Sequence, residues 1–125
     1  MAVTHPTLVR TGIANFVVDQ IDEGTPPGLL VLQTSGAVEV ATLTFSNPAF
    51  GAAAAGVATA SAITSDTSAT GGTIAKAELQ NAAGTAKILC SVTATGGGGD
   101  ITLNSIVVSA GQTVSITSLT YTAPP

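Results

Sequence analysis

The chain has 125 residues, of which only 8% are charged, and more than half are Ala, Thr, Ser or Gly. Three basic residues cannot form the positive surface that nucleic acids or acidic membranes require, so we expect neither partner. The single cysteine and the single histidine exclude an intrachain disulfide framework and a histidine pair for zinc.

The chain begins with a short segment, residues 1–7, that we expect to form an arm. It has no basic stretch followed by an apolar run, so it does not have the pattern of a signal peptide. We interpret His5 and Pro6 as part of an arm that contacts a partner rather than as part of a catalytic site. Either Thr4 or Thr7 can cap the helix that follows.

Residues 8–22 have the spacing of a helix. Apolar residues recur there every three or four positions, which predicts a helix with one apolar face. These residues are Leu8, Val9, Gly12, Ile13, Phe16, Val17 and Ile21. Gly24 and the prolines Pro26 and Pro27 form a stop signal. The alternative is a strand through residues 16–18.

After Gly28 comes a short apolar run over residues 29–32, and beyond it apolar residues alternate with polar ones, as in β-strands. The pattern predicts strands over residues 29–32, 38–45, 73–80, 86–92, 101–108 and 113–122, with a weaker strand over 57–64. Segments rich in Gly and Asn at 35–36, 81–84, 96–99 and 110–112 provide turns. The sequence therefore predicts a mainly β fold: an antiparallel β-sandwich or jelly-roll-like body with one short N-terminal helix. We expect one domain over residues 8–122 and a short tail over 123–125.

Three of the predicted strands change the parity of their apolar residues part-way along. The changes fall near Ala41, Asn104 and Thr117. A shift of one residue turns all later side chains to the opposite face of a sheet. Each strand therefore needs a bulge, a bend or a change of sheet at that place, unless both of its faces are buried there.

The segment from Phe50 to Val57 is rich in alanine and glycine. We expect a close-packed turn whose small side chains let another backbone approach, either within the domain or in another subunit. Together with the helix stripe around Phe16, this segment is a candidate surface for self-association. The candidate partner-contact residues are therefore His5, Pro6, Phe16, Phe50 and Val57.

No residue pattern in the sequence indicates catalysis. Cys90 lies among alternating apolar residues, so we interpret it as a packing residue. The three carboxylates between positions 19 and 23 lack the spacing of a calcium-binding loop. The glycine run at 96–99 leads into a strand and lacks the lysine of a phosphate-binding loop. We predict a protein that is not an enzyme and has no metal, cofactor or small-molecule substrate.

Several segments of the second half resemble small structural proteins of tailed bacteriophages and prophages. They are residues 65–73 (SDTSATGGT), 77–85 (AELQNAAGT), 100–104 (DITLN) and 110–120 (AGQTVSITSLT). The resemblance covers about residues 38–122 and does not include the predicted helix. It implies a capsid decoration, or cement, protein: a β-sandwich or jelly roll, commonly a homotrimer, that binds the major capsid protein on the virion surface. Such a protein is made in the host cytoplasm.

Two other functions stay open at this point. The chain can be a tail, neck or fibre component of the same kind of virion. It can also be a carbohydrate-binding module, although binding modules usually have clustered aromatic residues. The sequence has no tryptophan, three phenylalanines and one tyrosine, which disfavours a binding module. The resemblance favours the decoration protein, and the residues themselves do not separate a capsid location from a tail location.

Overall fold

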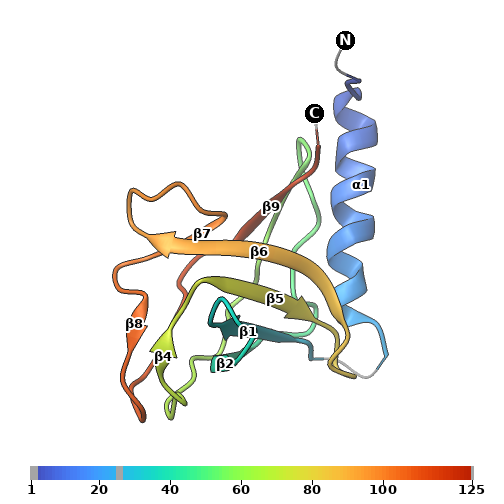
Figure 1. The fold of residues 1–125 in the computed structure, drawn as a ribbon. Coiled ribbons are helices and arrows are strands. Elements are labelled where there is room, and N and C mark those ends of the chain that lie inside the picture. The colour runs from blue at the N-terminus through green and yellow to red at the C-terminus, as the bar shows by residue number, and fades with distance from the viewer. Residues whose placement is uncertain (1–2, 25–26, 125) are drawn as a thin grey trace.

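A computed structural model describes residues 3–24 and 27–124 of the chain. It shows one helix standing beside a strongly curled, mainly antiparallel arrangement of strands (Figure 1). The expected mainly β fold, with a sandwich-like body and one short N-terminal helix, is confirmed. Met1, Ala2, Pro26 and Pro125, which belong to the predicted arm, helix stop and tail, lie outside the described residues.

The predicted helix is present as α1, Thr7–Asp19, which continues into a 3-10 turn, Gln20–Asp22. The alternative strand in this segment is therefore wrong. Gly24 follows with a φ of 84°, a conformation that glycine adopts at little cost. The predicted capping by Thr4 or Thr7 is also wrong, because Pro6 occupies the N-cap position and no side chain caps the helix there.

The main sheet has five strands in the order β2-β1-β5-β6-β7. Their bounds are β1 Leu29–Gln33, β2 Glu39–Thr44, β5 Lys76–Gln80, β6 Ala86–Ala94 and β7 Ile101–Leu103. All neighbours are antiparallel except β6 and β7, which are parallel. The expectation of antiparallel hairpins is wrong for this last pair. The glycine-rich loop after β6 returns the chain to a place beside Val92, and β7 then runs in the same direction as β6.

Two small sheets complete the β-structure that the model describes. One pairs β3 with β9 and the other pairs β4 with β8. The bounds are β3 Val57–Thr59, β4 Gly72–Thr73, β8 Val107–Val108 and β9 Thr120–Thr122. The predicted weak strand over 57–64 is therefore regular only in its first part, and isolated bridges from Ala60 to Phe50 and from Thr64 to Thr44 continue it.

All three predicted interruptions occur. In β2, Ala41 pairs with Leu32 of β1 and Glu39 pairs with the next residue, Gln33. Val40 is therefore an extra residue and forms a bulge. The strand predicted over 101–108 divides into β7, which pairs with β6, and β8, which pairs with β4. The strand predicted over 113–122 is reduced to a bridge from Val114 to Asp66, followed by β9. The changes of parity therefore mark places where the chain bends or changes its partner strand.

One hydrophobic core fills the space that the curled sheet, β9 and the helix enclose. Its largest fully buried side chains are Ile21, Leu30, Leu32, Leu43, Ile74 and Val40. Phe45 and Phe50 pack together in this core with ring centroids 5.8 Å apart. Phe50 is only 5% exposed, so the prediction that it contacts a partner is wrong for the folded chain.

The predicted C-terminal tail belongs to the packed structure at its first residue. Ala123 is buried, and its N–H donates a hydrogen bond to the Gly56 carbonyl (2.8 Å). The predicted tail over 123–125 is therefore wrong for Ala123, which belongs to the folded domain. The two ends of the described chain lie close together beside α1 (Figure 1).

Candidate functional site

Polar side chains on α1 connect the helix to the loop before β3. Thr11 Oγ1 accepts a hydrogen bond from Gly56 N–H (3.1 Å), and Asn15 Oδ1 accepts one from Ala53 N–H (2.8 Å). These backbone N–H groups would otherwise lack a partner at a part-buried position, where an unmade hydrogen bond is costly. The bonds therefore fix which side of the helix faces the body.

Two charged side chains extend these connections to both ends of the helix. The Arg10 guanidinium donates to the carbonyls of Ala123 (3.3 Å) and Pro124 (3.2 Å). The Asp22 carboxylate accepts a hydrogen bond from Ala49 N–H (3.0 Å). Hydrogen bonds to charged groups are stronger than those between neutral groups. The helix is thus fastened along its whole length by polar contacts, with Ala14 and Val18 buried between them.

The opposite side of α1, which we call the outer face, carries Leu8, Val9, Gly12 and Phe16. Leu8 is 84% exposed and Phe16 is 69% exposed. No atom lies within 4 Å of the position that a Cβ on Gly12 would take. The residues of the predicted apolar stripe therefore divide between two environments: Ile21 is buried in the core, while Leu8 and Phe16 point to solvent.

The predicted partner-contact residues do not form one surface. Phe16 lies on the outer face of α1, and Pro6 is exposed at the start of the helix. His5 is half-buried just before the helix, and Val57 is half-buried in β3. With Phe50 in the core, the outer face of α1 is what remains of the surface that we predicted from the sequence.

A second feature is an open seam in the β-structure between β6 and β9. β6 pairs with β5 along one side, but β7 covers its other side only from Val92 onward. β9 pairs with β3 on one side, and no described strand pairs with its other side. We define the seam by the three residues that form these open edges: Leu89 of β6, and Thr120 and Thr122 of β9.

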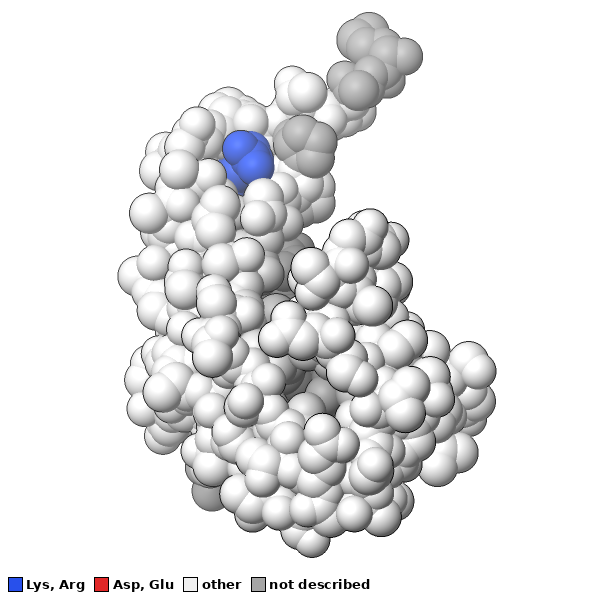
Figure 2. Space-filling view, turned by 90° about the vertical axis from the view of Figure 1, so that its left-hand side faces the viewer, with Lys and Arg blue, Asp and Glu red and all other residues white. Residues whose placement is uncertain are grey.

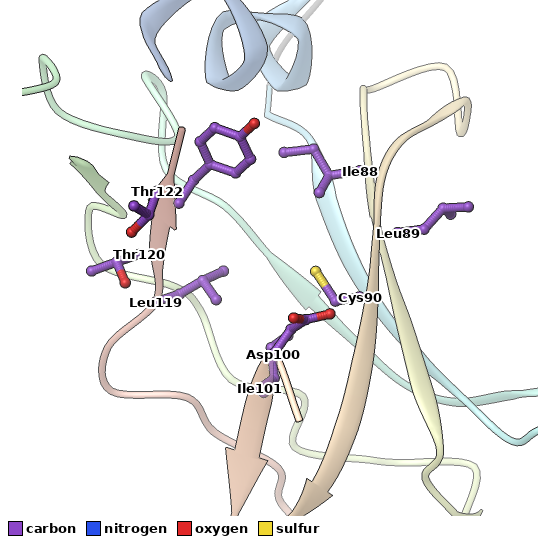
Figure 3. A pocket seen from close by; sticks show the side chains of 9 residues that line it. Ile88, Leu89, Cys90, Asp100, Ile101, Leu119, Thr120 and Thr122 are labelled. Atoms are coloured by element: carbon purple, nitrogen blue, oxygen red, sulfur yellow. The ribbon is translucent and has the colours of Figure 1, made fainter. Parts of the chain in front are cut away.

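A cavity of about 380 Å³ lies in the seam (Figure 3). Its lining residues are Ile88, Leu89, Cys90, Asp100, Ile101, Leu119, Thr120, Tyr121 and Thr122. The Asp100 carboxylate accepts hydrogen bonds from the Ser91 N–H (2.9 Å) and hydroxyl (3.2 Å) at one end of the open β6 edge. The lining of the seam therefore mixes apolar side chains with threonine and tyrosine, and it contains a single carboxylate.

Cys90 points into this cavity from β6, near Asp100 (Figure 3). Burial raises the pKa of its thiol to about 11, and the nearby Asp100 carboxylate contributes to the same shift. The thiol is therefore protonated at neutral pH, whereas nucleophilic and metal-binding cysteines act as thiolates. Cys90 also packs against the hydrophobic core, which agrees with the packing role predicted for it.

The described residues contain few groupings of reactive side chains. Within residues 3–24 and 27–124, no three His, Cys, Asp or Glu side chains come together in a way that could hold a metal ion. In the same part of the chain, no helix has the length and apolar character needed to span a membrane. Much of the surface is uncharged, and Figure 2 shows a hollowed face on which nearly all side chains are neutral.

The apolar pattern of the sequence does not predict the seam. One signal was available: Leu89 has the opposite parity to Ile88 and Cys90 in the same strand, so one large apolar side chain had to face outward. That Thr120 and Thr122 lie across from it depends on contacts between distant segments, and the residue pattern does not contain this information.

Comparisons with known proteins do not assign the chain to a family. No family model matches it, and neither a curated protein nor a solved structure matches it. The outer face of α1 and the seam are therefore interpreted from the geometry of this chain.

Proposed function

We propose that the chain is a structural subunit of a bacteriophage virion and not an enzyme. In this proposal it sits on the capsid surface as a decoration protein, binds the major capsid protein and stabilises the head. The observation that carries the proposal is the outer face of α1, where Leu8 and Phe16 are exposed while the polar side chains Thr11 and Asn15 face inward.

Such a face favours association. Burying a Leu or Phe side chain stabilises by about 1.5–3 kcal/mol relative to leaving it in water. From Leu8 to Phe16 the face extends for about 12 Å along α1. Gly12 lies between Leu8 and Phe16 and lets another backbone come close to the helix. We propose that neighbouring copies cover the outer face in a homotrimer, the state that the resemblance implies.

The low charge of the chain supports the same function. Broad surfaces of Thr, Ser and Asn can form wet interfaces in which water bridges many polar groups. A subunit that binds the assembled shell and not its free components stabilises the shell by mass action. This action requires contact surfaces and no chemical step.

The direct test uses phage particles that lack this protein. Depleted particles should release their genome at a lower temperature than complete particles, and adding the purified protein back should restore the original temperature. If depleted particles keep their full thermal resistance and the protein instead copurifies with isolated tails, the capsid proposal is wrong and the tail location replaces it.

A pair of variants tests the part played by the outer face. Phe16→Ser should lower the sedimentation coefficient of the isolated protein to that of a monomer. Val38→Ser removes a residue of comparable exposure, 62%, that lies outside α1, and it should leave the assembly unchanged. If both variants sediment like the unchanged protein, the outer face of α1 is not the self-association surface.

A further inference from the structure

The open edge of β6 is centred on Leu89. Val92 N–H donates to the Ala75 carbonyl (3.1 Å), and Cys90 stands opposite Ala77 in the same antiparallel pair. In an antiparallel ladder, alternate residues exchange hydrogen bonds with the partner strand. Leu89 is thus the residue whose backbone N–H and C=O point away from β5, toward the seam.

The backbone groups of β9 alternate in the same way. Ala60 N–H donates to the Leu119 carbonyl and Ala123 N–H donates to the Gly56 carbonyl, each at 2.8 Å. The backbone N–H and C=O groups of residues 119, 121 and 123 therefore point toward β3. Thr120 and Thr122 direct their backbone groups to the other side, where the cavity lies.

Both edges of the seam thus present unpaired backbone groups to the same cavity. Proteins commonly protect an open strand edge with a bulge, a proline or a charge. Here a change of register near Ala86 interrupts one end of the β6 edge, and Asp100 covers the Ser91 N–H at the other end. Between them the edge at Leu89 is open, and the side chain of Leu89 is 73% exposed.

The charge in the seam indicates what kind of segment fits. Asp100 is the one ionisable carboxylate among the lining residues, and its hydrogen bonds come from Ser91. Among the described residues, the one ion pair joins Lys87 to Glu23 and does not involve Asp100. An extended segment that carries Lys or Arg would therefore complement the seam.

A second copy of this chain does not offer such a segment. Its three basic residues all lie in elements of the fold: Arg10 in α1, Lys76 in β5 and Lys87 in β6. Arg10 already binds carbonyls near the end of the chain, and Lys87 is paired with Glu23. A basic strand in the seam therefore has to come from a different polypeptide.

We propose that the seam between β6 and β9 binds one extended strand of another polypeptide by β-augmentation, with a basic residue of that strand next to Asp100. Main-chain hydrogen bonds to Leu89, Thr120 and Thr122 would provide affinity, and the lining of leucine, isoleucine and threonine side chains would select small or β-branched side chains. The identity of the partner rests on the proposed function, under which the strand belongs to the major capsid protein.

The test uses the full chain and two capped synthetic peptides, Thr-Val-Lys-Val-Thr-Val-Thr and the same peptide with Glu in place of Lys. Amide hydrogen exchange, measured by NMR, should slow about tenfold at Leu89, Thr120 and Thr122 when the Lys peptide is present at a saturating concentration. The Glu peptide should bind about tenfold more weakly, and added salt should reduce this difference.

Two variants separate the seam from general charge effects. Asp100→Asn should bind both peptides equally, while Asp66→Asn, which removes a carboxylate that binds backbone N–H groups elsewhere, should keep the preference for Lys. If exchange at the three amides does not change, or if both peptides bind the unchanged protein equally, the proposal is wrong. If exchange slows when the protein alone is concentrated, a second copy occupies the seam and the proposal is also wrong.

Attachment to depleted particles distinguishes a failure of this inference from a failure of the proposed function. The Lys peptide should compete with the particles for the protein, and Asp100→Asn should attach about tenfold more weakly. If attachment is normal in both experiments, the shell does not supply the strand although decoration itself stands. If the peptide binds the seam but the protein never attaches to capsids, the strand acceptor stands and the proposed function is wrong.

Discussion

The five-stranded sheet and the helix α1 are held in the molecule by different forces. In the sheet, Leu30, Leu32 and Leu43 are fully buried; the central strand β1 is buried on both faces, and burial alternates along β5. In the helix, Leu8 and Phe16 are exposed, and hydrogen bonds from polar side chains connect it to the body. The sheet is thus organised by hydrophobic burial, and the orientation of the helix is organised by polar contacts.

This difference shows what an apolar pattern determines. Periodicity identifies residues that share a face, but a helix with apolar residues on more than one side can dock in more than one orientation. In α1 the small residue Ala14 and the acceptors of Thr11 and Asn15 match the alanine-rich loop before β3. The larger apolar residues are then left for another surface.

Removing one leucine from each region should reveal the difference most strongly. Leu43→Ala removes a fully buried side chain from β2, and we expect a loss of about 2–5 kcal/mol in the free energy of unfolding. Leu8→Ala removes a side chain that is 84% exposed, and a surface change of this kind stays within about 0.5 kcal/mol. Urea denaturation of both variants at low protein concentration measures the two values. Equal losses would show that α1 is buried in solution.

A pair of glycines tests the junction of the two regions. Gly28 lies just before β1, where a Cβ would stand 2.4 Å from the Gln80 carbonyl oxygen and 2.6 Å from the side chain of Ile21. Gly28→Ala should therefore cost about 1–3 kcal/mol, as overpacking does elsewhere. Gly12→Ala meets no atom within 4 Å and should stabilise the monomer by roughly 0.5–1 kcal/mol, because alanine favours a helix. Thermal unfolding separates them, and a stabilising Gly28→Ala would contradict the packing at this junction.

Local pattern was sufficient to predict much of the β-structure. The turns at 35–36 and 81–84 and the interruption of the strand over 101–108 follow from residue types and parity. Asn81 illustrates why: its own side chain accepts hydrogen bonds from Ala83 and Thr85 N–H, so the turn needs no distant partner. Such elements are specified within a few residues.

The features that local pattern could not predict depend on distant partners. The parallel pairing of β6 with β7 is fixed at its start by Asp100 and Ser91, nine residues apart. The orientation of α1 depends on Asn15 meeting Ala53, 38 residues away. The exposed sites therefore could not be chosen from the apolar residues alone.

Removing one polar contact of α1 should have a smaller effect than the changes in the core. Asn15→Ala leaves Ala53 N–H without its acceptor, and we expect a loss of about 1 kcal/mol in the free energy of unfolding. Asn15→Asp keeps an acceptor at the same place and should restore most of this loss. Gln20→Ala is the control, because the Gln20 amide binds only the Phe16 carbonyl within the helix in an exposed bond. If Asn15→Ala and Gln20→Ala behave alike in urea, polar contacts do not orient the helix.

The last prediction concerns Cys90 in the seam, and its effect is confined to alkaline pH. Its pKa is raised from 9.0 to about 11, first by burial and then by the charge of Asp100. Between these two pH values the unfolded chain ionises the thiol while the folded chain keeps it protonated, so ionisation favours unfolding there. The contribution of the protonated thiol to stability is therefore complete below pH 9 and is lost as the pH rises toward 11.

Two measurements check this behaviour. The difference in stability between the unchanged protein and Cys90→Ala should be constant below pH 9 and should shift against the unchanged protein above it. Alkylation by iodoacetamide should be slow at pH 8 and should rise toward half its maximal rate near pH 11, because the thiolate is the reacting form. Asp100→Asn should move this midpoint down but keep it above 9, since burial is the larger cause and remains in the variant. A midpoint near 9 in the unchanged protein would mean that the seam is open to water at Cys90, and that the packing seen between β6 and β9 does not persist in solution.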